Sequence, residues 1–133
     1  MRHRTLLSLA LAALPALAAC DGGTGSDQAG GEYIAALETP DGRLEGALLV
    51  ELTGTGISDV YAASLALFEQ PVSGGRRLML IREPAGQIDF RVRMAPGSAL
   101  PAVRVLEVVG PDDVPRASTD GYSVSFTRTR GEQ

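Results

Sequence analysis

The sequence predicts an all-β fold, an antiparallel β-sandwich, for the part of the chain that follows residue 31. Apolar and polar residues alternate with a period of two in several short runs, which is typical of half-buried strands. Groups of Gly, Pro, Asp and Ser separate these runs and indicate tight turns. Helical periodicity is scarce. About seven short strands at this spacing favour two packed antiparallel sheets.

Residues 1–19 have the pattern of a secretory signal peptide. A cationic start, Met1-Arg2-His3-Arg4, precedes a run of Leu and Ala that is interrupted near its end by Pro15. This run is shorter than the ~20 apolar residues that a transmembrane helix needs.

The single cysteine, Cys20, follows the apolar run. Leu17-Ala18-Ala19-Cys20 resembles the lipobox of bacterial lipoproteins at all four positions. The resemblance implies that Leu17, Ala18 and Ala19 are recognised by the signal peptidase, which cuts before Cys20. It also implies that the Cys20 sulfur receives a diacylglyceryl group and that the new amino terminus is often acylated as well. Asp21 resembles the enterobacterial signal for retention in the inner membrane.

This resemblance implies a protein of the bacterial envelope, held by lipid either at the inner membrane facing the periplasm or at the outer membrane. Two alternatives stay open: an ordinary secretory cut after Ala18, which Ala16-Leu17-Ala18 would permit, and a buried structural cysteine. Residues 20–31 are rich in Gly, Ser and Asp and are expected to form a flexible linker between the lipidated cysteine and a β-sandwich domain over residues 32–133.

The clearest predicted strand covers residues 87–94, where Ile88, Phe90, Val92 and Met94 alternate with polar neighbours. In a strand over 43–53, Leu44 is expected on the same face as Leu48, with Glu45 on the opposite, outward face. Val105-Leu106 breaks the alternation of a further strand, which indicates a bulge or burial on both faces. The other predicted strands cover residues 64–69, 77–82, 103–109 and 122–127.

Two further expectations concern local structure. Residues 57–64 are the only candidates for a turn or two of helix. The aromatic side chains are few, and each is expected to pack in the core: Tyr33, Tyr61, Phe68, Phe90, Tyr122 and Phe126.

Three stretches resemble the cohesin-like β-sandwiches of bacterial secreted proteins. They are Gly46–Leu52 as an early strand, Gly86–Val92 as a late strand, and Val108–Pro115 with Asp120–Val124 as the final pair. The resemblance covers residues 45–126 and implies a sandwich fold with a bias toward binding. It implies no contact surface for dockerin modules.

Composition excludes several classes of function. The net charge of −4 and the scattered arginines argue against nucleic acid as a partner. The chain has no Lys and no Trp, and its one histidine, His3, leaves with the signal peptide. A catalytic triad, a Cys–His pair, a Lys nucleophile and the usual His- or Cys-ligated metal sites are therefore excluded from the processed chain. We expect no enzyme activity and no cofactor.

Oxygen ligands for calcium are the remaining metal chemistry. Asp112, Asp113 and Asp120 lie in neighbouring loops, although turn formation also explains them. Three functions stay open: a lipid-anchored module that binds another envelope protein or a polymer, a structural spacer without a ligand, and a carbohydrate hydrolase that uses two carboxylates. A contiguous apolar patch on one sheet would favour the first of these.

Overall fold

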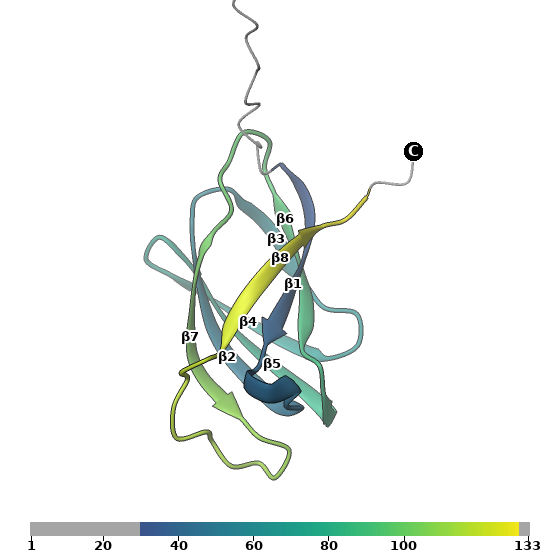
Figure 1. The fold of residues 1–133 in the computed structure, drawn as a ribbon. Coiled ribbons are helices and arrows are strands. Elements are labelled where there is room, and N and C mark those ends of the chain that lie inside the picture. The colour runs from purple at the N-terminus through teal and green to yellow at the C-terminus, as the bar shows by residue number, and fades with distance from the viewer. Residues whose placement is uncertain (1–29, 131–133) are drawn as a thin grey trace, which may run out of the picture.

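The computed structural model describes residues 30–130 and has two four-stranded antiparallel sheets that face each other (Figure 1). The described part of the chain contains no α-helix, and a short 3-10 turn, η1 (Pro40–Gly42), follows the first strand. The predicted all-β sandwich is thus confirmed. Sheet A has the order β3 (Ile57–Tyr61), β6 (Asp89–Met94), β1 (Gly31–Glu38), β8 (Ser123–Arg128). Sheet B has the order β4 (Ala66–Val72), β5 (Gly75–Gly86), β2 (Glu45–Thr53), β7 (Ala102–Val109).

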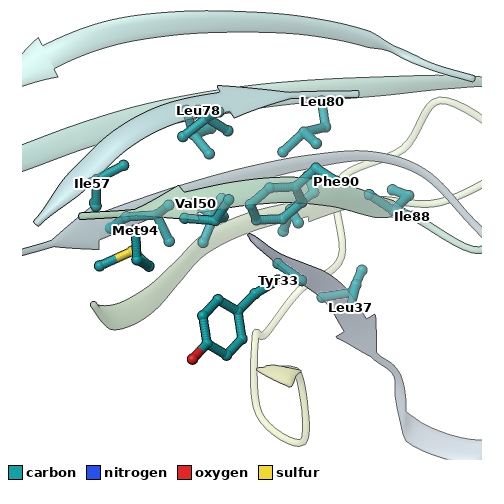
Figure 2. Close-up of a cluster of buried hydrophobic side chains, with 14 of the residues drawn as sticks. Tyr33, Leu37, Val50, Ile57, Leu78, Leu80, Ile88, Phe90 and Met94 are labelled. Atoms are coloured by element: carbon teal, nitrogen blue, oxygen red, sulfur yellow. The ribbon is translucent and has the colours of Figure 1, made fainter. Parts of the chain in front are cut away.

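The core lies between the inward faces of the two sheets, as Figure 2 shows. Phe90 of β6 is 2% exposed and lies among the apolar side chains of sheet B (Figure 2). As the alternation predicts, every second residue from Ile88 to Met94 is buried. Burial of this apolar surface is the main favourable contribution to folding. The other buried apolar residues are Tyr33, Ala35, Leu37, Leu48, Val50, Leu52, Ile57, Val60, Leu78, Leu80 and Val108.

Residues 57–64, the only candidates for a turn or two of helix, contain no helix. Residues Ile57–Tyr61 form β3, the edge strand of sheet A, which pairs with β6. Ile57 and Val60 reach the core from this strand. Tertiary packing against β6 therefore decides the conformation of a segment too short to have a clear period of its own.

Two irregularities interrupt the pairing of β2. Between Leu49 and Val50 the register on β7 shifts from Glu107 to Val105, so Leu106 is the extra residue of a bulge. The predicted break at Val105-Leu106 is thus confirmed as a bulge.

The second irregularity is larger. Glu45 pairs with Gly86, but Ala47 pairs with Ile81, so residues 82–85 of β5 have only Gly46 opposite them on β2. The alternation of β2 does not continue through this point. Glu45 is fully buried, whereas Leu44 is 57% exposed, and the predicted faces of these two residues are therefore wrong.

The two ends of the sandwich are distinct. At one end β1 begins at Gly31 opposite Met94, and Ala95 donates a backbone hydrogen bond to Gly56. We call it the tether end, because the residues that precede β1 in the sequence are those expected to form the linker. At the opposite end, called the far end, β1 ends at Glu38 and leads into η1 (Figure 1). The loop of residues 110–122 between β7 and β8 also lies at the far end, since Gly121 approaches Pro40. No helix within residues 30–130 is long and apolar enough to cross a membrane.

Candidate functional site

The outer face of sheet B carries an apolar patch. Phe68 of β4 is 58% exposed and its cross-strand neighbour Met79 of β5 is 46% exposed. On the next strand, β2, Leu49 is the residue that pairs with Met79. In this row β7 contributes Glu107 opposite Leu49, whereas the next cross-strand row toward the far end is apolar on all four strands. The patch consists of Ala47, Leu49, Ala66, Phe68, Met79, Ile81 and Val109.

Phe68 is thus an exception to the expectation that the aromatic residues pack in the core. Tyr61 is a second exception, because it is only partly buried and lies on the outer face of sheet A. Tyr33 and Phe90 are buried, and Tyr122 and Phe126 pack against the core from β8 and the residue before it. Because Phe68 is exposed, packing in the core does not explain why an aromatic residue stands at this position.

A row of paired charges borders the patch toward the tether end. Glu51 of β2 accepts a hydrogen bond from Arg77 of β5 at 3.0 Å and lies 4.0 Å from Arg104 of β7. Charges that are paired in this way contribute little to stability at the surface. The row has two arginines, Arg77 and Arg104, for one glutamate, so it presents one excess positive charge to an approaching molecule.

A groove of about 700 Å³ continues the patch toward the far end. Three segments line it: residues 44–47 of β2 and the residue before it, residues 81–85 of β5, and residues 109–113 at the end of β7. The lining is mostly apolar. A groove of this size is within the range of binding sites for small ligands or for a few side chains of a partner.

The floor of the groove requires a glycine. A Cβ atom at Gly46 would lie 2.9 Å from the carbonyl oxygen of Gly110, which is closer than real Cβ contacts. Gly46 also lies opposite residues 82–85 of β5, where regular pairing would place one residue instead of four. The lack of a side chain at this position lets the backbone of Gly110, where the wall of residues 110–113 begins, approach β2 closely.

The wall that follows β7 is held by backbone hydrogen bonds. Gly110 donates to Val114 at 2.9 Å, Asp113 donates to Gly110 at 3.2 Å, and Arg116 donates to Val108 at 2.8 Å. Asp113 has a φ of 61°, in the left-handed region that Asp and Asn tolerate better than most residues. The wall is therefore a closed turn with a fixed shape.

A buried carboxylate fastens the same loop to sheet B. The Oε1 atom of Glu45 accepts a hydrogen bond from the Tyr122 hydroxyl at 2.7 Å. Its Oε2 atom accepts from Arg116 Nε at 3.1 Å and lies 3.0 Å from Arg116 Nη2. Both carboxylate oxygens are thus satisfied, which a fully buried charge requires.

The environment of this cluster shifts two pKa values. The hydrogen bond to Glu45 raises the pKa of Arg116, which keeps the guanidinium charged. Burial raises the pKa of Tyr122, with a further contribution from its hydrogen bond to Glu45. The cluster therefore acts as one structural unit, in which Glu45 of β2 holds the loop after β7 through Arg116 and Tyr122.

Four exposed carboxylates surround the groove and the adjoining patch. Glu83 and Asp113 line the groove, Asp112 lies beside Asp113, and Glu107 of β7 is opposite Leu49. None of the four has an ion-pair partner among residues 30–130. Carboxylates therefore outnumber cations around the groove, although its lining also includes Arg82, whose Nη1 donates a hydrogen bond to Ser64 Oγ at 3.2 Å.

A separate polar cluster lies on the outer face of sheet A. Glu32 of β1 accepts hydrogen bonds from the Tyr61 hydroxyl at 2.5 Å and from Arg91 at 3.0 Å, and Arg93 lies 3.4 Å away. The hydrogen bond from Tyr61 is the main cause that holds the pKa of Glu32 below its ordinary value of 4.5. The cluster links three strands of sheet A, and no groove adjoins it among those described.

This cluster predicts a loss of stability in acid. Because the pKa of Glu32 is lowered on folding, the unfolded chain takes up this proton first as the pH falls. The stabilisation is present above pH 4.5 and is lost as the pH drops through the lower, folded-state pKa. We expect the slope of melting temperature against pH below about pH 5 to be shallower for Glu32→Gln than for the parent chain. Tyr61→Phe should reduce the slope in part, and an unchanged slope in both variants would contradict the assignment.

The residues singled out from the sequence have different outcomes. Leu17, Ala18, Ala19, Cys20 and Asp21 lie outside the described residues. Asp112 and Asp113 lie at the turn after β7, and Asp120 lies later in the same loop. In residues 30–130 there is no group of three or more His, Cys, Asp or Glu side chains that could hold a metal ion.

The groove was not predicted from the sequence. Its lining comes from three segments whose juxtaposition depends on strand register and on the long bulge in β5. Glu83-Pro84-Ala85-Gly86 belongs to the Gly- and Pro-containing groups that predict turns between strands, but in the structure it forms the irregular part of β5. No protein-family model matches the chain, and comparison with curated proteins and with solved structures finds no match either.

Proposed function

We propose that the protein is a lipid-anchored component of a bacterial envelope whose β-sandwich is a non-catalytic binding or assembly module. The sequence Leu17-Ala18-Ala19-Cys20 supports the anchor. The observation that carries the binding role is the contiguous apolar patch on the outer face of sheet B, together with the groove that extends it. The partner is another envelope protein or a polymer of the envelope.

The anchor follows from the chemistry of Cys20. A thioether-linked diacylglyceryl group and an acylated amino terminus would together supply two or three acyl chains. Each buried CH₂ contributes about 0.8 kcal/mol, and stable attachment requires two chains or another second signal. Residues 20–31 would then serve as a linker, and Asp21 would favour the inner membrane where the enterobacterial rule applies.

The exposed patch favours binding over a purely structural spacer. Soluble domains rarely leave a large contiguous apolar surface uncovered, and such surfaces commonly mark interaction sites. A spacer with no ligand would have no use for Phe68 and Met79 at exposed positions, where they add nothing to the core. The resemblance of residues 45–126 to cohesin-like sandwiches supports the same bias toward binding.

A carboxylate-based hydrolase is the weaker alternative. The groove does contain two carboxylates, Glu83 and Asp113. Both side chains are exposed, whereas a general acid needs a pocket that excludes water and favours its protonated form. The aromatic platform that commonly stacks on sugars is also lacking in the groove lining, which favours a binding module.

The anchor is tested by Cys20→Ser in the full chain, expressed in a bacterium that processes lipoproteins. We expect the parent protein in the membrane fraction and the variant in the soluble fraction, because serine cannot form the thioether. Ser26→Ala in the linker serves as the control and should leave the protein in the membrane. If Cys20→Ser also stayed in the membrane fraction after a salt wash, the lipid anchor would be wrong.

A further inference from the structure

Exposed carboxylates surround the groove at the far end of sheet B, and β1 begins at the opposite end of the domain. We propose that it binds an extended segment of a partner protein in which apolar side chains alternate with, or are flanked by, Lys or Arg. This inference rests on the proposed binding role and names the class of ligand.

The position of the groove argues for a protein partner away from the bilayer. β1 begins at the tether end, where the linker joins, and its eight residues run to the far end. At about 3.3 Å per residue, β1 spans about 25 Å from Gly31 to the far end, where the groove lies. An anchor attached through Cys20 would thus leave the groove open to the space beyond the membrane surface.

The lining of the groove argues for apolar side chains in the ligand. Leu44, Ala47, Ile81 and Val109 form apolar parts of it, and Leu44 is 57% exposed. Burying this surface is favourable only for a ligand that brings apolar atoms of its own.

The rim argues for positive charge beside those apolar side chains. Glu83, Glu107, Asp112 and Asp113 are exposed and have no ion-pair partner within the described residues, whereas Glu51 is paired with arginines. Asp112 also interacts with Arg116, and Arg82 lies in the lining. Glu83, Asp113 and Glu107 nevertheless leave an excess of carboxylates for positive residues of a ligand to meet. Complementary charges of this kind speed association and exclude partners of the wrong sign.

The same rim argues against a second copy of this chain as the occupant. Two copies that joined symmetrically through this face would bring Glu83 and Asp113 of one copy toward the same acidic rim of the other. Like charges that face each other across an interface are unfavourable.

The test uses a fluorescein-labelled peptide of ten residues in which Val or Leu alternates with Lys. The matched control peptide has Glu in place of every Lys. The full chain is isolated from membranes and reconstituted in phosphatidylcholine vesicles, which carry no net charge, and peptide binding is measured by co-sedimentation. Vesicles without protein give the background.

We expect the Lys peptide to bind and the Glu peptide to remain in the supernatant. Binding should weaken at higher salt, because the rim contribution is electrostatic. The double variant Glu83→Lys/Asp113→Asn, in which Asn keeps the left-handed backbone at residue 113, should weaken binding about tenfold or more. Asp89→Lys, a matched charge reversal at an exposed position on sheet A, should leave binding unchanged.

Leu44→Asp tests the apolar part of the groove. It should also weaken binding, while Leu100→Asp, a change at another exposed leucine near the tether end, should not. All five replaced residues are on the surface, and thermal melting of each variant verifies that the fold is retained. If both peptides bound equally, or if Leu44→Asp and Leu100→Asp had equal effects, the inference would be overturned.

The outcomes separate this inference from the proposed anchor. If the parent chain floats with the vesicles but binds neither peptide, the groove inference fails and the anchor stands. If the chain does not associate with vesicles, the anchor fails, and the same peptide measurements in solution still decide the groove. Self-association that Leu44→Asp abolishes would assign the groove to a second copy and overturn the inference.

Discussion

Glu45→Ala is expected to lower the free energy of unfolding by about 3 kcal/mol. The carboxylate is fully buried and holds both Arg116 and Tyr122, so its removal leaves a guanidinium and a hydroxyl without their partner. The value is at the lower end for a broken buried pair, because the Arg116 side chain is 29% exposed and can be hydrated again. In a domain of this size the melting temperature should fall by about 12–24 °C.

The matched control is Glu107→Ala, the same chemical change at an exposed glutamate with no ion-pair partner among the described residues. It should change the stability by no more than about 0.5 kcal/mol. The double variant Glu45→Ala/Arg116→Ala should be less destabilised than the sum of the two single changes, because the two side chains are directly coupled. Additive effects would mean that the buried pair is not the source of the loss.

Phe90→Ala should destabilise the fold by about 3–5 kcal/mol. Phe90 is 2% exposed and lies between the two sheets, so its removal leaves a cavity lined by apolar side chains (Figure 2). The loss combines the transfer of the ring to water with the cavity that remains. Chemical denaturation monitored by circular dichroism measures the change.

Phe68→Ala is the matched control for Phe90→Ala. The ring of Phe68 is 58% exposed on the outer face of sheet B, and its replacement should cost no more than about 0.5 kcal/mol. Similar losses for the two variants would show that Phe68 supports the fold, and the apolar patch would then need no partner to explain it.

The sequence was a reliable guide where one face of a strand is apolar and the other polar. Residues 87–94 alternate without interruption, and β6 buries the expected side chains. β1 was not predicted because its outward positions include Ile34 and Ala36, so the polar half of the alternation is lacking. Its central place in sheet A depends on partners that are distant in the sequence, which no local pattern encodes.

The candidate site was harder to predict for the same reason. Glu45 follows the local alternation as an outward residue, yet the bulge in β5 changes the register of β2 at this point and places the carboxylate inside. The side chains that make this burial tolerable, Arg116 and Tyr122, are 71 and 77 residues away in the sequence. The burial of Glu45 and the groove are thus properties of strand pairing, whereas local composition was sufficient for the fold class.

The place of β1 in sheet A has a consequence for how the chain reaches its folded state. Within residues 30–130, the first strand, β1, pairs with β6 and β8, and β8 is the last strand. Contacts of such long sequence separation form slowly, and sheet A is incomplete until Ser123–Arg128 is available. If the chain is exported as an extended polypeptide, sheet A can be completed only after Ser123–Arg128 has crossed the membrane.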